Sequence, residues 1–207
     1  MALAKRSNNG GNNIFVDIKG NTGEIVRKLE GGGVETYDSL DGTVTGVDVR
    51  SNTYKGEEIH SLRMKIEDGS DTKIFASVGL GSFFAGKIVG LLNAADLSKP
   101  ITLNVGQMKA GETVGDRVVE KDTTWVTAWQ DGKRLTPDFG NGATELPKAN
   151  KVVVSGKEMN DMTPVNEKVA ELIGGLIDKL HPEAGPSDDH EQVDVDAAAG
   201  AAQRMAA

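Results

Sequence analysis

Cysteine is absent from the chain, and this absence excludes disulfide bonds, thiolate metal sites and a thiol nucleophile. No apolar run reaches the roughly 20 residues that a membrane-spanning helix needs. The N-terminal segment Met1–Arg6 leads into a Ser/Asn/Gly stretch instead of an apolar one, so it lacks the form of a secretory signal. Together these features predict a soluble protein of a reducing, cytoplasmic compartment.

Catalytic groupings are missing as well. The chain has three histidines, His60, His181 and His190, and their spacing gives no two-histidine metal pair and no Ser/His/Asp arrangement. His60 falls on the inward face of an expected strand, where a hydrogen-bonded core residue is the more common role. We therefore expect no catalytic residue, no metal and no cofactor, and a binding protein rather than an enzyme.

One short segment imitates a nucleotide-binding loop. Residues Gly81–Ile88 nearly match the phosphate-binding pattern G-x-x-x-x-G-K-[ST] between an expected strand and an expected helix. The last position lacks the hydroxyl group that would hold Mg²⁺, and Phe83 and Phe84 are bulky where the loop amides must be free. We interpret the segment as the start of a buried helix, with a nucleotide-hydrolysing enzyme as the alternative.

Acidic residues outnumber basic ones, but most of the excess lies in the C-terminal tail. The net charge is −8, and the segment from Glu183 onward contributes −5 through six acidic residues and one basic residue. This composition cannot form a core. The rest of the chain is close to charge balance, so the acidic total does not exclude a nucleic-acid-binding surface.

Alternation of apolar and polar residues predicts a mainly β fold with helices, an α+β protein. The 26 glycines suit many turns and short strands. A buried helix is expected after Ser82, and Asp131-Gly132 has the form of a two-residue hairpin turn. The central elements follow the order of an OB-like antiparallel barrel, which has three strands, a helix and then two or three strands. Another strongly curved antiparallel sheet fits equally well. Strands are expected at residues 14–18, 24–29, 42–50, 59–67, 73–78, 101–105, 123–130, 133–135 and 151–154.

A second, amphipathic helix is expected from Thr163-Pro164 to His181-Pro182. Its apolar face either packs against its own domain or serves for self-association or partner binding. The chain then divides into four parts. These are a flexible Gly/Asn-rich N-terminus (1–12), a β-rich binding domain (13–157), the C-terminal helix (158–182) and an acidic, Ala-rich disordered tail (183–207).

Basic and aromatic residues that share strand faces are the strongest functional signal. Trp125 and Trp129 are four positions apart and therefore share one face of the expected strand, beside a hairpin that carries two basic residues. Cations that follow phosphates and flat rings that stack on bases are what single-stranded nucleic acid requires. The candidate binding residues are Arg50, Tyr54, Lys55, Arg63, Lys65, Lys73, Phe75, Trp125, Trp129, Lys133 and Arg134.

The opposite assignment of the tryptophan strand stays open. In that assignment Trp125 and Trp129 form the core face, and Val126 and Ala128 point outward. Lysine and arginine on outward strand faces also commonly serve only to keep a sheet edge soluble. Lys5 and Arg6 add a further possible basic contact at the N-terminus.

The segments Val105–Gly111 and Trp125–Gly132, together with this general plan, resemble the single-stranded-DNA-binding proteins of bacteriophages. More narrowly, the chain is similar to the single-stranded-DNA-binding RNA polymerase cofactors of N4-related phages, over about residues 35–157. The tail departs from the bacterial pattern because Gln203–Ala207 contains no terminal aromatic residue.

The resemblance implies single-stranded DNA binding with little sequence specificity, in phage replication or transcription within the infected bacterial cell. It also implies a homo-oligomer, and a tail that contacts phage or host polymerase and replication proteins and competes with DNA for the basic surface. The alternative is a virion or assembly protein that oligomerises through its C-terminal helix and has no affinity for DNA.

Overall fold

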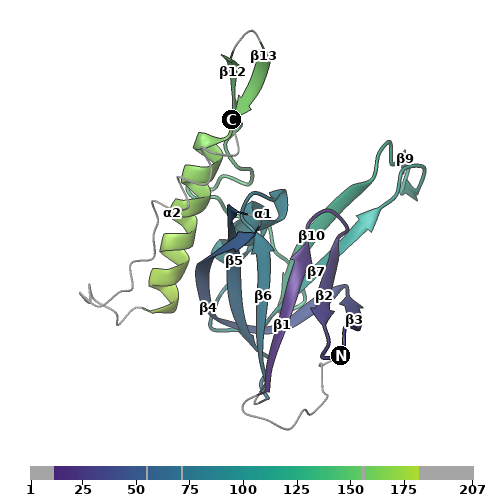
Figure 1. Ribbon diagram of the computed structural model, residues 1–207, viewed down its shortest axis with the longest axis vertical. Helices are drawn as coiled ribbons and strands as arrows, with labels where there is room; N and C mark the ends of the chain where they lie inside the picture. The colour runs from purple at the N-terminus through teal and green to yellow at the C-terminus, as the bar shows by residue number, and fades with distance from the viewer. Residues whose placement is uncertain (1–11, 55, 71, 155–156, 182–207) are drawn as a thin grey trace.

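The computed structural model describes residues 12–54, 56–70, 72–154 and 157–181. Over these residues the protein is mainly β with two helices, and its centre is one large mixed sheet of nine strands (Figure 1). The N-terminal segment with Lys5 and Arg6, the candidate Lys55, and the acidic tail lie outside the described residues.

The strand order in the large sheet is β11-β10-β7-β4-β5-β6-β1-β2-β3. Strands β1 and β6 run parallel, whereas the other neighbouring pairs are antiparallel. The strands span β1 (Asn12–Lys19), β2 (Glu24–Lys28), β3 (Val34–Tyr37), β4 (Ser39–Tyr54), β5 (Glu57–Glu67), β6 (Thr72–Gly79), β7 (Ile101–Met108), β10 (Thr123–Gln130) and β11 (Lys133–Arg134).

The sheet is not closed into a barrel, and it is not purely antiparallel, which corrects the closed-barrel expectation. The reason is that β1 joins β6 in parallel and carries β2 and β3 as additional strands. The sheet nevertheless curls, and the turn between β1 and β2 packs against strands β7 and β10. A Cβ atom at Gly23 would lie 2.1 Å from the carbonyl oxygen of Gly106 in β7, and the Thr124 hydroxyl donates to the Gly20 carbonyl at 2.7 Å.

The core lies inside this curl and follows the alternation in the sequence. On β5, for example, Leu62, Met64 and Ile66 are buried, and the residues between them point outward. Helix α1 (Phe83–Ala94) fills the interior, and eight of its residues are buried. The Ser82 hydroxyl accepts the Ala85 N–H at 3.3 Å, so the expected cap and the expected buried helix are both present.

Helix α2 (Thr163–Leu180) packs on α1 and β4 and buries Val169, Leu172, Ile173 and Leu176. Its apolar face is therefore covered by its own domain. This confirms the first of the two roles expected for the helix, packing within the domain, for these four residues. Residues 158–161 are not part of this helix, because they belong to strand β13.

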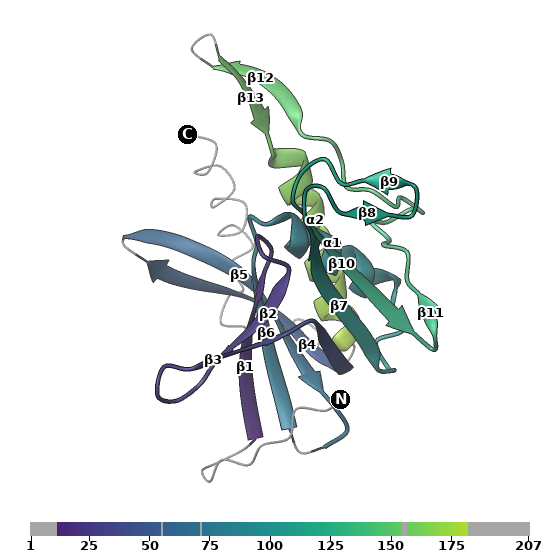
Figure 2. The same ribbon diagram turned by 90° about the vertical axis from the view of Figure 1, so that its right-hand side faces the viewer.

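Two small hairpins stand outside the large sheet (Figure 2). They are β8 (Thr113–Val114) with β9 (Arg117–Val118), and β12 (Asn150–Val154) with β13 (Lys157–Asp161). Strands β3, β8, β9 and β13 were not expected. Strand β4 also continues to Tyr54, past the expected strand end at residue 50, so β4 and β5 form a long hairpin that extends beyond β6.

Candidate nucleic-acid interface

Aromatic and basic side chains meet on the outward side of four adjacent strands, β4, β5, β6 and β1. The inward positions of these strands are filled by the aliphatic core, so the intervening residues point to the surface. We call this surface the aromatic–basic face. It comprises Phe15, Arg50, Arg63, Lys65, Lys73 and Phe75.

A pair of stacked rings lies on the face, with Phe15 exposed and Phe75 half-buried. Phe15 and Phe75 are direct neighbours in the parallel pairing of β1 and β6, with ring centroids 5.2 Å apart and ring planes 16° from parallel. Phe15 is 62% exposed. A large apolar ring that is left in water on a flat sheet surface offers a platform for another flat, apolar group.

Arginine side chains border the ring pair. The Arg63 guanidinium carbon lies 5.3 Å from the centroid of the Phe75 ring, which is a cation–π distance. Its Nε and Nη2 atoms donate to Oδ2 of Asp48 at 3.1 and 2.7 Å. The other carboxylate oxygen of Asp48 accepts from Nε of Arg50 at 3.1 Å. One carboxylate therefore joins two arginines beside the rings.

Lysines continue the positive charge along the face. The Lys65 ammonium lies 3.0 Å from Glu67, and this hydrogen bond is the main reason that the pKa of Glu67 is below its ordinary value. Lys73 pairs across the strands with Glu67 and is exposed. An ion pair as accessible to water as that of Lys65 with Glu67 contributes little to stability, and its cation exchanges easily to another anion.

The tryptophans lie elsewhere on the sheet, although they also face outward. Val126, Ala128 and Gln130 are the buried residues of β10, so the opposite assignment, with the tryptophans in the core, is wrong. Strands β7 and β4 lie between β10 and β5 in the sheet. We call Trp125, Trp129, Lys133 and Arg134 the β10 patch.

Within the β10 patch the two tryptophans have different surroundings. Trp125 is half-buried over its cross-strand neighbour Gly106, where a Cβ atom would lie 2.4 Å from the indole ring. The ring thus occupies the space that a side chain at Gly106 would fill. Trp129 is 42% exposed and pairs across the strands with Arg134.

Carboxylates surround Trp129. It lines a shallow depression of about 290 Å³ together with Asp41 and Asp131. Asp131 also accepts the Lys99 ammonium at 2.9 Å. With two carboxylates beside its ring, the depression is less favourable to phosphate than a surface where one carboxylate joins two arginines.

One further candidate lies near the end of the long β4–β5 hairpin. Tyr54 is the last residue of β4, and Lys55 is outside the residues that the structure describes. Of the residues predicted from the sequence, the structure brings Arg50, Arg63, Lys65, Lys73 and Phe75 onto one surface.

Sequence reasoning missed two exposed aromatic residues. Phe15 was placed on a strand, and the alternation with buried Ile14 and Val16 already indicated that it points outward. Phe83, at the start of α1, is 69% exposed, and the Lys87 ammonium lies 5.6 Å from its ring centroid. Phe83 was overlooked because it lies within the Gly81–Ile88 segment, which was interpreted as the start of a buried helix.

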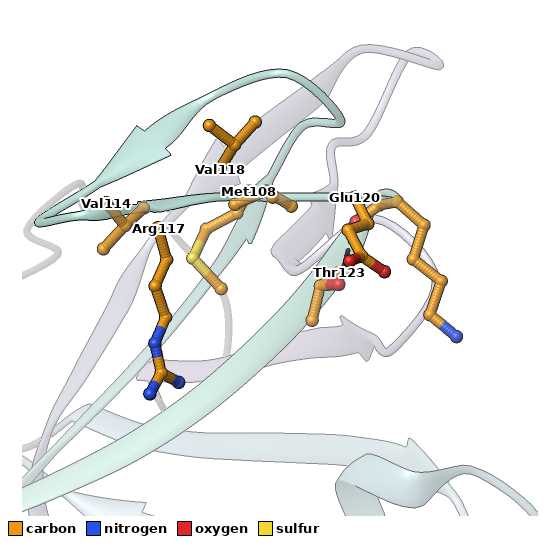
Figure 3. A pocket seen from close by; sticks show the side chains of 8 residues that line it. Met108, Val114, Arg117, Val118, Glu120 and Thr123 are labelled. Atoms are coloured by element: carbon orange, nitrogen blue, oxygen red, sulfur yellow. Dashed lines mark hydrogen bonds between the residues drawn. The ribbon is translucent and has the colours of Figure 1, made fainter.

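A separate recess of about 410 Å³ lies at the β8–β9 hairpin (Figure 3). Met108, Val114 and Val118 supply its apolar surface, and Arg117 and Glu120 project beside them. Both valines are more than half exposed, at 53% and 63%. None of the candidate binding residues lines this recess, so it is a separate feature from the aromatic–basic face.

Other kinds of site find no support in the part of the chain that the structure covers. No group of three or more His, Asp or Glu residues there could hold a metal ion, and no helix there is long and apolar enough to cross a membrane. His60 is only 6% exposed and its Nδ1 atom lies 2.8 Å from the Ser51 hydroxyl, which matches its expected role in the core.

Comparisons with protein-family models, with curated proteins and with solved structures found no match for this chain.

Proposed function

We propose that this protein binds single-stranded DNA, with little sequence preference, through the aromatic–basic face. It acts as a non-enzymatic binding protein of the bacteriophage type, in DNA replication or transcription within the infected cell. The observation that carries the proposal is the exposed Phe15–Phe75 ring stack with the Arg63 guanidinium beside it.

Base stacking explains why single strands are the preferred ligand. An unpaired base can leave its neighbours and lie against an exposed ring, and each such contact contributes about 1–3 kcal/mol. The bases of a duplex are already stacked and are covered on both faces, so the rings gain no partner. Every base has a flat face, and this mode of contact therefore discriminates little between sequences.

The arrangement of elements supports an OB-like core within the larger sheet. Strands β4, β5 and β6, then α1, then β7 and β10 follow the order of that class, with β1, β2 and β3 added along one edge. Such sheets present one strand-rich surface to nucleic acid. The aromatic–basic face lies on β4, β5, β6 and the added strand β1.

The other proposed partners involve segments outside the described residues. We propose that the acidic tail contacts polymerase or replication proteins, and that the protein acts as a homo-oligomer. The assembly-protein alternative depends on a free apolar face on α2, and the burial of Val169, Leu172 and Leu176 within the domain weakens it.

The test is fluorescence anisotropy of labelled oligo(dT) and of a duplex of equal length, each at two salt concentrations. We expect binding that favours the single strand and weakens as salt rises. Phe15→Ala should weaken oligo(dT) binding about 10- to 100-fold, since one stacking contact is lost. Absence of oligo(dT) binding at low salt would overturn the proposal.

Val34→Ala is the matched control. Val34 is 60% exposed on β3, close to the 62% of Phe15, but it lies outside the aromatic–basic face. We expect this variant to bind oligo(dT) as the unmodified protein does. An equal loss of affinity in both variants would mean that any truncation of the N-terminal strands weakens binding, and that stacking is not the cause.

A further inference from the structure

We infer that Asp48 occupies the position of a nucleic-acid phosphate between Arg50 and Arg63, and that DNA must displace it to bind. This inference rests on the proposed function. It adds a specific phosphate subsite to the aromatic–basic face and a residue that sets both the affinity and the salt dependence.

The geometry of the three side chains carries the inference. Each oxygen of the Asp48 carboxylate accepts from a different arginine, Oδ1 from Nε of Arg50 at 3.1 Å and Oδ2 from Nη2 of Arg63 at 2.7 Å. A phosphodiester also presents two anionic oxygens to surrounding donors, and arginine is suited to both anions. The cation pair is thus already positioned around one oxyanion.

Both arginines keep hydrogen-bond donors for a ligand. A guanidinium has five N–H donors, and the contacts with Asp48 use two from Arg63 and one from Arg50. Arg50 is the more accessible arginine, with 55% of its side chain exposed against 24% for Arg63, and 37% of the Asp48 side chain is exposed. A phosphate can therefore approach the arginines from solvent, and the carboxylate can turn away without leaving water.

The phosphate subsite is linked to the ring stack through Arg63. Its guanidinium both contacts Asp48 and lies 5.3 Å from the Phe75 ring centroid. A nucleotide whose phosphate replaces the carboxylate thus has its base next to the Phe15–Phe75 stack. This places the two recognition elements of a single-stranded polynucleotide, a cation pair and a ring, side by side.

The sign of the effect separates this inference from a simpler role for Asp48. If the carboxylate competes with phosphate, removing its charge strengthens DNA binding. If it mainly holds Arg63 over Phe75, removing its charge loosens the arginine and weakens DNA binding. The two roles predict opposite changes in the same measurement.

The experiment is oligo(dT) binding by full-length Asp48→Asn across a series of salt concentrations. Asparagine keeps the size and one acceptor oxygen but removes the charge. We expect about 5- to 10-fold tighter binding at low salt, and an advantage over the unmodified protein that shrinks as salt screens the charge of Asp48.

Asp17→Asn is the matched control. Asp17 is on the same side of β1 as Phe15 and pairs with Lys19 at 3.1 Å, so this substitution makes the same change in net charge close to the rings. We expect less than a 2-fold change. Equal tightening in both variants would assign the effect to net charge and overturn the inference, and so would weaker or unchanged binding by Asp48→Asn.

The unmodified protein provides a second measurement that does not depend on any variant. In NMR spectra, the Nε–H signals of Arg50 and Arg63 should both shift when oligo(dT) is added, because their acceptor changes from carboxylate to phosphate. Unchanged signals at saturating oligo(dT) would overturn the inference and leave the proposed function standing. No binding of oligo(dT) at all would overturn the proposed function and the inference with it.

Discussion

The aromatic–basic face and the β10 patch contain the same kinds of residue, yet their surroundings differ. On the aromatic–basic face, two rings stack on one another in water and a carboxylate holds two arginines beside them. On the β10 patch, Trp125 lies over Gly106, and Trp129 shares a depression with Asp41 and Asp131.

The difference shows that aromatic and basic content alone does not define a binding surface. What matters is the residue across the strand. A glycine opposite Trp125 leaves room for the indole ring on the sheet, whereas a phenylalanine opposite Phe15 stacks on that ring and leaves Phe15 exposed. Substitutions in the β10 region should therefore lower stability, and those on the aromatic–basic face should lower affinity for DNA.

The largest expected effect on stability is at the turn that packs against β7. Gly23 has a φ of +67°, and a Cβ atom there would lie 2.1 Å from the Gly106 carbonyl oxygen. Because that neighbour is backbone, no side-chain rotation relieves the clash, and Gly23→Ala should lower the free energy of unfolding by about 3 kcal/mol. Urea unfolding measures the change.

Gly20→Ala in the same turn is the control. Its Cβ atom would lie 3.4 Å from the Phe84 ring, which can adjust, so we expect a loss below about 1 kcal/mol. Equal losses in the two variants would contradict the close approach of the turn to β7.

A smaller effect should separate the two tryptophans. Trp125→Ala removes the half-buried ring over Gly106 and should lower the free energy of unfolding by about 2 kcal/mol, less than a fully buried tryptophan would cost. Trp129→Ala removes a ring that is 42% exposed and should cost less than about 1 kcal/mol. The same urea titration tests both, and a larger cost at Trp129 would reverse the assignment.

A carboxylate near the β10 patch should show a small, local pH effect. The Asp122 carboxylate accepts the Ala110 N–H at 2.9 Å and the Lys109 ammonium at 3.0 Å, and these bonds, the backbone one first, lower the pKa of Asp122. A lowered pKa means that the ionised form stabilises the loop above the ordinary aspartate pKa of about 3.9, and that this is lost as the pH falls through the lower folded value.

NMR of the Ala110 amide proton tests this effect. Its chemical shift should titrate with a midpoint below about 3.9, and Asp122→Asn should remove the titration. A midpoint at or above the ordinary value would mean that the carboxylate is not held as the structure has it. Asp122 thus stabilises a loop through hydrogen bonds, whereas Asp48 accepts hydrogen bonds from two arginines of the proposed binding surface.

The smallest expected effect is on tryptophan emission. Trp125 and Trp129 are the two tryptophans of the chain, and both lie on β10. If DNA follows the aromatic–basic face alone, oligo(dT) should leave the emission unchanged while anisotropy reports binding. Quenching during the same titration would add the β10 patch to the binding surface, as the sequence predicted.

Local patterns predicted much of the fold. Alternation predicted strands where β1, β5 and β6 lie, and Asp131-Gly132 forms the expected hairpin turn, with φ values of 51° and 73°. The Ser82 cap was also evident. These features depend on neighbouring residues, whose preferences are visible in the sequence itself.

Features that depend on distant residues were not predictable in the same way. The parallel pairing of β1 with β6 has no local signal, so the meeting of Phe15 with Phe75 was missed. A bulge in β4 between Val44 and Gly46 buries both Val44 and Val47 and breaks the simple alternation. The short strands β8 and β9 have two residues each, too few for any periodic pattern.

The pairing of β1 with β6 also has a consequence for how the protein assembles. Phe15 and Phe75 are 60 positions apart, and the arginines that border them come from β4 and β5, within that interval. Contacts across so long a loop form slowly, because chain entropy is lost before the contact is gained. Strand β1 must wait until β6 has been made before the two can pair, so the ring stack is completed only after the strands that carry its neighbouring arginines have been synthesised.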